Sequence, residues 1–168
     1  MHLHGTVGPA ATSIAGIAER AGVTRLTVYR HFADDAALFE ACSAHWLSRQ
    51  TLPDPTLWEQ ISDPENRLRT GLVDLYRFFR AGSDMLYHIY RDIDVIPEAR
   101  RRAIQARDTH FGDVLAEPFS GTPARRRRIR AIVGHAASFW TWWSLCREHD
   151  MSDRDAIDAM TRAAQISQ

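Results

Sequence analysis

The sequence contains no lysine, so arginine alone supplies its 21 basic residues, and 21 acidic residues balance them to a formal net charge of zero. A neutral chain has no general electrostatic attraction for a polyanion. The two cysteines, Cys42 and Cys146, lie far apart and form no CxxC pair, which argues against a disulfide framework and a zinc site. The apolar runs cover only a few residues each, too few to span a bilayer.

A secretory signal is also missing, because no charged segment leads into an apolar stretch at the start of the chain. We therefore expect a cytoplasmic protein without a membrane partner. The 168 residues are 45% apolar and 25% charged, which is typical of a folded protein. A chain of this length can bury a sizeable core.

Helix start and stop signals recur along the chain, whereas no sustained alternation rich in Val, Ile and Thr predicts a strand. The sequence therefore predicts an all-α fold. Pro53 and Pro55 mark residues 51–57 as a linker between an N-terminal domain, residues 1–50, and a helical domain, residues 57–168. We expect helices at about residues 12–21, 24–30, 34–46, 62–82, 85–96, 97–119, 122–149 and 152–166.

Residues 12–32, TSIAGIAERAGVTRLTVYRHF, have the pattern of a helix-turn-helix. Gly22 supplies the tight turn, Val23 is expected to fill the space between the two helices, and Val28 faces inward from the second helix. A helix of this kind enters the major groove of DNA, which is wide enough to admit one. Its exposed side chains are all hydrogen-bond donors, which phosphates and base edges require. They are Thr24, Arg25, Thr27, Tyr29, Arg30 and His31.

The segment IAERAGVTRLTVYRHF followed by LFEAC resembles the N-terminal DNA-binding domain of the TetR family of transcriptional regulators, over roughly residues 7–46. The rest of the chain resembles the family only in its architecture, a divergent helical ligand-binding domain that ends in two dimerisation helices. The resemblance implies a homodimeric regulator, most often a repressor, that binds a double-stranded DNA operator. A small-molecule effector would release it from the operator, and no cofactor is implied.

The resemblance also implies a role for each donor of the motif. Arg25 and Thr27 would lie nearest the bases, and Arg30 would contact either a base or a phosphate. The alternatives are that Tyr29 only packs the domain and that His31 only caps its helix. The phosphate contacts would come from Tyr29, from His31, and from Thr12 or Ser13 in the first helix of the motif.

Two features depart from the family pattern. The family usually has a basic residue at the start of the helix after the motif, whereas this chain has Asp34 and Asp35 there. The family also has a full helix before residue 12, but only MHLHGTVGPAA precedes it here, with His2-Leu3-His4 as the expected tail end of that helix. We therefore expect the chain to be short at its N-terminus, through a misplaced start or a true truncation.

Aromatic side chains on the inward faces of several helices predict an apolar effector pocket in the second domain. An aromatic stripe at helical spacing also suits a plain core, and this alternative stays open. The predicted lining residues are Tyr76, Phe79, Tyr87, His110, Phe111, Trp140 and Trp143.

The helix predicted over residues 122–149 is apolar around most of its circumference, which indicates burial on two sides. We expect one side to face a second subunit, with the final helix completing a two-fold, four-helix interface. An intrachain core helix is the alternative. The predicted interface residues are Phe139, Trp142, Cys146, Ile157, Met160 and Ala164.

Metal and catalytic sites are not predicted. The histidines in the helices lack partners at i, i+4 spacing, His2-x-His4 lies near the terminus, and no catalytic constellation is evident. We therefore expect neither a metal nor an enzyme. Two alternative functions stay open: a ligand-binding helical dimer that has lost DNA binding, and a small helical enzyme or carrier.

Charge is unevenly distributed along the neutral chain. Residues 1–50 contain four Arg and four acidic residues, whereas residues 97–130 contain nine Arg and four acidic residues. Because phosphate neutralisation supplies most nonspecific affinity for DNA, the N-terminal domain would bind DNA weakly through charge alone.

Overall fold

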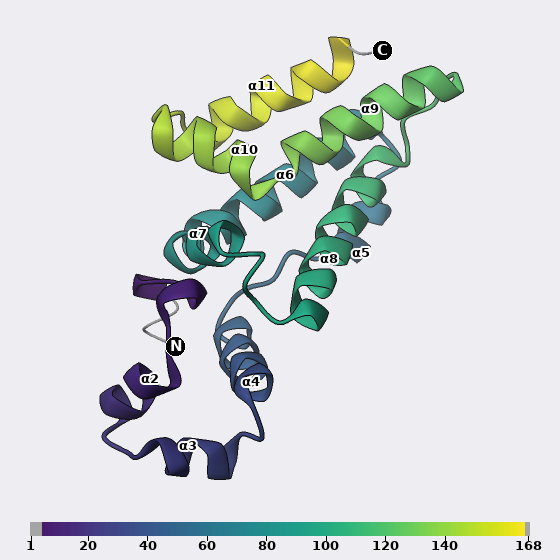
Figure 1. Cartoon of the computed structure of the whole chain (residues 1–168). Coiled ribbons are helices and arrows are strands. Elements are labelled where there is room, and N and C mark those ends of the chain that lie inside the picture. Colours follow the sequence, from purple (N-terminus) through teal and green to yellow (C-terminus); the bar gives the residue numbers. More distant parts are fainter. Residues whose placement is uncertain (1–4, 167–168) are drawn as a thin grey trace. The chain divides into compact units, whose positions relative to one another are not determined.

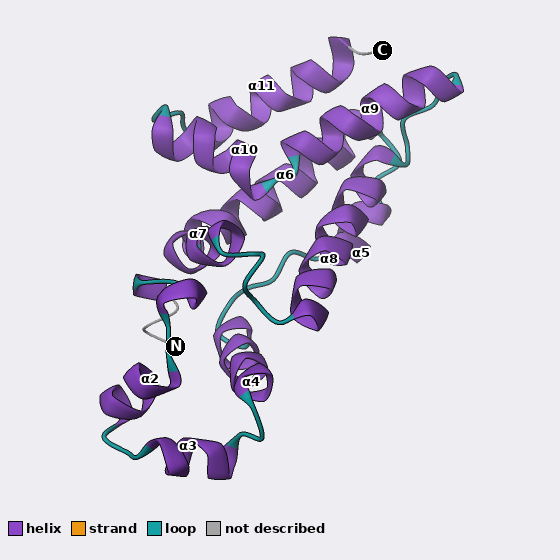
Figure 2. Ribbon diagram, viewed as in Figure 1, coloured by secondary structure: helices purple, strands orange, loops and turns teal. Residues whose placement is uncertain are grey.

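The computed structural model describes residues 5–166, and all the regular elements in this range are helices (Figure 2). The all-α prediction is confirmed. Within the same range, no helix combines the length and the apolar character that a bilayer-spanning segment needs. His2-Leu3-His4, expected to be the tail end of a preceding helix, lies outside the described residues.

The chain divides into two compact units, each assembled from two stretches of sequence. The first unit is Met1–Thr51 with Gly82–Ala103, and the second is Leu52–Ala81 with Ile104–Gln168. The sequence pattern alone puts residues 82–103 in the C-terminal domain, whereas in the structure they pack with the N-terminal residues.

The first unit contains the helix-turn-helix. After the first stretch of the second unit, the chain returns to the first unit over residues 82–103. The elements of this unit are η1 (Pro9–Ala11), α2 (Ile14–Ala21), α3 (Arg25–His31), α4 (Asp35–Leu47), α7 (Ser83–Arg91) and the first part of α8 (Glu98–Ala116); Figure 1 labels the α-helices among them.

Side-chain caps explain where the first three α-helices begin. The side-chain oxygens of Ser13, Thr24 and Asp34 each accept the backbone N–H three residues ahead, at 3.1, 3.2 and 2.7 Å. Such bonds satisfy donors that have no partner within the helix. The predicted starts of these three helices are therefore confirmed.

The second unit is built around α6. The α5 helix begins inside the predicted linker, because the Asp54 carboxylate accepts the N–H of Thr56 at 3.0 Å and caps it. Asp63 caps α6 in the same way, by accepting the N–H of Asn66 at 2.8 Å. The elements of this unit are α5 (Pro55–Glu59), α6 (Pro64–Ala81), the rest of α8, α9 (Pro123–Ala136), α10 (Phe139–Trp143), the π-helical turn η2 (Ser144–Glu148) and α11 (Asp153–Ile166).

The prediction of one helix over residues 122–149 is wrong, because the chain forms three helical segments there. Ser138 is extended, and its hydroxyl accepts the N–H of Trp140 at 3.2 Å, which caps a new helix. The Thr141 hydroxyl donates to the carbonyl of His135 at 2.6 Å and satisfies an acceptor at the end of α9. Side-chain hydroxyls thus replace helical hydrogen bonds at the break.

The buried face of α6 forms the core of the second unit, and the helix contacts α5, α10 and α11. Leu68, Leu72 and Leu75 are fully buried on this face. Tyr76 is buried beside them, and its hydroxyl donates to the carbonyl of Ala136 at 3.0 Å, so its polar atom has a partner in apolar surroundings. Burial raises the pKa of Tyr76 well above its ordinary value, so the phenol stays neutral.

Asp153 joins α6, α10 and α11 through its carboxylate. Its Oδ1 accepts the indole N–H of Trp142 at 3.0 Å, and its two oxygens accept the Arg80 guanidinium, each at 2.6 Å. Burial raises the pKa of Asp153, but hydrogen bonds from Arg80 and Trp142 lower it by more, so the pKa lies below its ordinary value. Burial of Cys146 nearby, together with the charge of Asp153, raises the pKa of that thiol to about 12.

Replacing Asp153 with Ala should lower the free energy of unfolding by roughly 1–3 kcal/mol, because the buried indole N–H of Trp142 loses its acceptor. A carboxylate with a lowered pKa stabilises the fold above its unfolded-state pKa, and this contribution is lost as the pH falls through the folded-state value. Urea unfolding at neutral pH and at about pH 3 tests both statements, since the difference between wild type and variant should shrink in acid.

The matched control for this experiment is Glu148→Ala, which removes an exposed acid from η2. It should change the free energy of unfolding by less than about 0.5 kcal/mol. Equal losses for the two variants would contradict the anchoring role of Asp153.

Candidate nucleic-acid interface

Gly22 ends α2 and makes the turn of the helix-turn-helix. Its backbone is left-handed, with φ 66° and ψ 29°, a conformation that costs other residues energy. The N–H of Val23 donates to the carbonyl of Ala18 at 3.0 Å, and the N–H of Gly22 donates to Glu19 at 3.1 Å. This pair of bonds is a Schellman motif, which satisfies the last carbonyls of α2 before α3 begins.

Val28 attaches α3 to the rest of the first unit. Its side chain is 6% exposed and packs with Ala18 of α2 and Leu38 of α4. The expected role of Val23 as the filler between the helices is wrong, because its side chain is 41% exposed and these three residues already fill the space. Four partly buried side chains surround this core: Ile14, Ile17, Phe32 and Cys42.

Most other side chains of α3 are exposed to solvent. Tyr29 is 48% exposed, and the side chains of Arg25, Arg30 and His31 are exposed as well. Leu26 is not among the predicted contact residues, yet its side chain is 63% exposed on the same helix. The signal for it was its position two residues before the buried Val28, out of phase with the core. An exposed apolar side chain there suits contact with a thymine methyl group.

Several predicted donors already make local hydrogen bonds. The hydroxyls of Thr24 and Thr27 share a bond of 3.0 Å, and Thr24 also caps α3. Thr12 donates to the carbonyl of Gly8 at 2.7 Å, and Ser13 caps α2. The exposed guanidinium groups of α3 are therefore its strongest features for meeting phosphates and base edges.

The two acids after the motif have different roles in the structure. Asp34 caps α4, as its distance of 2.7 Å from the N–H of Ala37 shows. Asp35 is exposed in the first turn of α4, and the Tyr29 hydroxyl donates to its Oδ1 at 3.5 Å, a long hydrogen bond. Asp35 therefore puts negative charge next to a side chain that was predicted to bind a phosphate.

Hydrogen bonds connect the end of α7 to the segment that precedes α2. Arg91 donates to the carbonyl of Val7 at 3.0 Å, and Asp92 accepts the N–H of Ala10 at 3.0 Å. Arg91 also donates to Asp92 at 2.7 Å, and this hydrogen bond is the main reason that the pKa of Asp92 is lowered. Gly8 lies between these groups with φ +89°, and a Cβ there would lie 2.4 Å from Arg91 Nη2. These bonds explain why residues 82–103 pack with the N-terminal residues.

Two of the predicted effector residues belong to a packed aromatic core. Phe79 is buried, and its ring centroid lies 5.5 Å from that of Phe139 and 6.0 Å from that of Trp142. Tyr76 is fully buried with its hydroxyl hydrogen-bonded. Neighbouring side chains therefore occupy the space around both rings.

The other predicted effector residues have varied surroundings. Tyr87 lies on α7 in the first unit, whereas the remaining ones lie in the second. Phe111 packs edge-on against Trp58, with ring centroids 5.3 Å apart. His110 is exposed, and the side chain of Trp140 is 42% exposed. Trp143 is half-buried, with the Arg147 guanidinium 5.7 Å above its ring.

Most residues predicted at a dimer interface are buried within a single chain. Met160 is half-buried, and the other five are less than one-tenth exposed. Trp142 shows the reason, because its ring packs on Phe79 and Phe139 and its indole N–H donates to Asp153. These five are Phe139, Trp142, Cys146, Ile157 and Ala164.

Metal ligands do not gather anywhere in residues 5–166: no group of three or more His, Cys, Asp or Glu side chains there could hold an ion. The two cysteines are free thiols in different units, with Cys42 half-buried and Cys146 buried. The surface of α3 is therefore the feature of the described residues that points most directly to a function.

Comparison with known proteins identifies the N-terminal region. Residues 1–42 match the family model described as "Bacterial regulatory proteins, tetR family". The matched stretch includes α2, α3 and the start of α4, the helices that share the core around Val28. No curated protein and no solved structure gives a significant match to the chain.

Gly8→Ala should destabilise the first unit more than Gly22→Ala does. Both positions have positive φ, so both variants carry backbone strain of roughly 1 kcal/mol. At Gly22 a new Cβ meets nothing within 4 Å, whereas at Gly8 it collides with Arg91 and Asp92 and breaks the bonds between α7 and the N-terminal segment. Thermal unfolding compares the two variants. A smaller loss at Gly8 would mean that the α7 contacts add nothing to the fold.

Proposed function

Because residues 1–42 match the model of the tetR family of bacterial regulatory proteins, we propose that this chain is a homodimeric, cytoplasmic transcriptional repressor that a small molecule releases from its operator. The chain is a DNA-binding transcriptional regulator through its N-terminal domain. The observation that carries the proposal is the anchoring of α3 by Val28, while Arg25 and Arg30 of the same helix stay exposed. The family is one of regulators, and we propose no enzyme activity.

In our proposal, α3 enters the major groove and Arg25 reads a base near the start of the helix. An arginine that donates two bonds to guanine discriminates against other bases by roughly 1–3 kcal/mol. Leu26 joins this contact through its exposed apolar side chain. Thr27 assists base reading, Arg30 contacts a base or a phosphate, and the phosphate contacts come from Tyr29, His31 and Ser13.

The neutral charge of the N-terminal domain has a consequence for this mechanism. Residues 1–50 contain as many acidic residues as arginines, and Asp35 adds negative charge beside Tyr29. Each phosphate contact contributes about 0.9 to the slope of log affinity against log salt. We therefore expect a shallow salt dependence and a specificity that rests on a few base contacts.

The same observations favour a second candidate function, a ligand-binding helical dimer that has lost DNA binding. The acidic pair after the motif and the balanced charge both weaken attraction to phosphate. Selection of binding sequences from a random duplex library separates the two functions. An enriched sequence that is also bound at physiological salt supports the repressor, and no enrichment supports the second function.

Effector binding in the second unit needs a change in its aromatic core. Phe79 is enclosed by Phe139 and Trp142, so a ligand that reaches Tyr76 and Phe79 must separate these rings. Such a ligand would shift the population between two arrangements of the unit, and only its differential affinity for them changes the affinity for DNA. For the effector we propose only a chemical class, an apolar, aromatic small molecule.

Arg25→Ala should weaken binding to the selected duplex by about 10- to 100-fold, the equivalent of one bidentate base contact. Arg25→Lys keeps the charge but loses the two-pronged geometry, so it should lose specificity while nonspecific binding is preserved. Fluorescence anisotropy at two salt concentrations measures both quantities.

Arg154→Ala is the control for the Arg25 variants, because it removes an exposed arginine from α11 in the second unit. It should leave affinity for the selected duplex unchanged. An equal loss for Arg25→Ala and Arg154→Ala would contradict the assignment of base reading to α3.

The proposed dimer predicts a mass in solution of twice the 19.1 kDa of one chain. Trp140 and Met160 are the proposed contact residues, because Trp140 is 42% exposed and Met160 is half-buried in the single chain. Light scattering after size exclusion should show a dimer for the wild type and a weakened dimer for Trp140→Glu. Val73→Glu, also at an exposed apolar position of the second unit, is the control. A monomeric wild type would overturn the dimer.

A further inference from the structure

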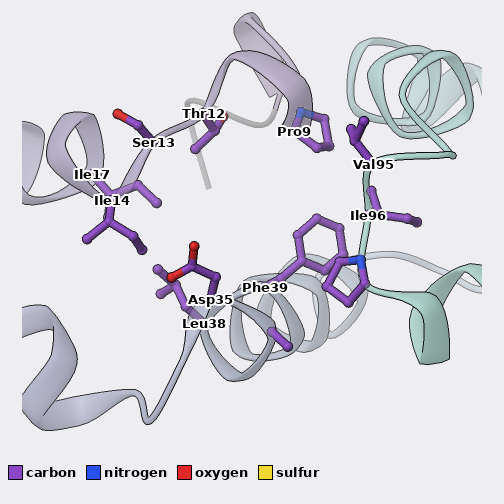
Figure 3. Close-up of a pocket in the computed structure, with 12 residues that line it drawn as sticks. Pro9, Thr12, Ser13, Ile14, Ile17, Asp35, Leu38, Phe39, Val95 and Ile96 are labelled. Atoms are coloured by element: carbon purple, nitrogen blue, oxygen red, sulfur yellow. The ribbon is translucent and has the colours of Figure 1, made fainter.

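A pocket of about 610 Å³ opens within the first unit (Figure 3). It lies between η1, the start of α2, the first turns of α4 and the segment 95–97, and all of its lining residues belong to this unit. Its volume is within the roughly 300–1,000 Å³ of small-molecule sites. The predicted effector residues do not line it, so it is a site separate from the aromatic core of the second unit.

Most of the residues that line this pocket are apolar. Figure 3 shows Ile14, Ile17 and Leu38 on one side of an open centre and Phe39 and Pro9 on the other, with Val95 and Ile96 on the segment beyond them. Phe39 and Ile96 are 7% and 4% exposed, so they are fixed by packing on their other sides. A ligand with an apolar body would therefore meet a rigid surface that is already formed.

Asp35 is the charged residue that lines the pocket. The other two polar lining residues are committed locally, since Thr12 donates to Gly8 and Ser13 accepts the N–H of Gly16. Within residues 5–166, the Asp35 carboxylate accepts only the long hydrogen bond from Tyr29, and it is exposed at the rim. It is thus the group that can select a ligand by charge.

The electrostatic balance at the pocket is negative. The N-termini of α2 and α4 both lie at its wall, and each carries about half a positive charge from its backbone dipole. Asp34 and Asp35 at the start of α4 bring two full negative charges to the same place. The carboxylates exceed the dipoles, and no arginine lines the pocket in the described part of the chain.

We propose that this pocket binds a small molecule that has an apolar body and one cationic group, with the cation paired to Asp35. The ligand would lie between α2 and α4, the two helices that hold α3 through Val28. The proposal also gives a role to Asp35, which departs from the basic residue usual in the family. It goes beyond the proposed function and does not rest on it, because ligand binding is measured in the absence of DNA.

Tetraphenylphosphonium and tetraphenylborate test the proposal, because they have nearly the same shape and opposite charge. Isothermal titration of the full chain should show saturable binding of one phosphonium ion per chain, with the borate ion at least about tenfold weaker. Asp35→Asn should weaken phosphonium binding about two- to fivefold, as expected for a partly solvated ion pair. Val95→Trp should abolish it by filling the pocket mouth.

Two matched variants control for general effects. Asp84→Asn neutralises an exposed acid in the first turn of α7, and Val73→Trp enlarges an exposed valine of α6. Neither should change phosphonium binding. Val95 is 63% exposed, so the tryptophan there can be accommodated, and thermal unfolding of each variant confirms that it is folded.

Three results would overturn the proposal. Equal binding of the two ions would assign the pocket to an uncharged apolar occupant. Unchanged phosphonium binding by Asp35→Asn or Val95→Trp would place the probe elsewhere. A wild-type dimer that Val95→Trp dissociates, together with no probe binding, would make the pocket a contact between two copies of the chain.

Discussion

The packing of Val28 between Ala18 and Leu38 is the contact on which the position of α3, the proposed DNA-binding helix, depends. Side chains project from an α-helix at fixed angular intervals. Burying Val28 therefore fixes how α3 is rotated about its axis. Arg30 lies on the side of α3 away from Val28, and Arg25 is exposed in the first turn of the helix. The left-handed turn at Gly22 brings α2 and α3 into the positions that make this contact possible.

Carboxylates that accept several donors connect the remaining elements of each unit. Asp92 binds Arg91 and the N–H of Ala10 in the first unit, and Asp153 binds Arg80 and the indole of Trp142 in the second. In both places the cation is an arginine, the basic side chain that this chain uses throughout. The planar guanidinium group can bind both oxygens of a carboxylate, which gives these contacts a defined geometry.

The two acidic residues after the helix-turn-helix contribute to the balanced charge of the chain and have different structural roles. Asp34 is needed as a helix cap, whereas Asp35 makes only a long contact with Tyr29 and lines a pocket. In the proposed function, a regulator with this arrangement gains little from general attraction to DNA, and its specificity rests on direct contacts from α3. The further proposal pairs the acidic rim of the pocket with a ligand of opposite charge.

Local features of the fold and the candidate site could be predicted from the sequence. The caps at Ser13, Thr24 and Asp34, the turn at Gly22 and the inward position of Val28 depend on neighbours within a few residues. Such interactions can be predicted from residue type and spacing. The exposed Leu26 could have been found by the same periodicity.

The sequence by itself therefore determined the helical class, the helix starts in the motif and the inward position of Val28 in α3. Only the tertiary structure decided that residues 82–103 pack with the N-terminal segment and that a break at Ser138 divides the predicted long helix. It also decided that Trp142 lies inside its own chain. These features depend on partners far away in the sequence, such as Arg91 with Val7 and Trp142 with Phe79, and periodicity contains no information about such pairs.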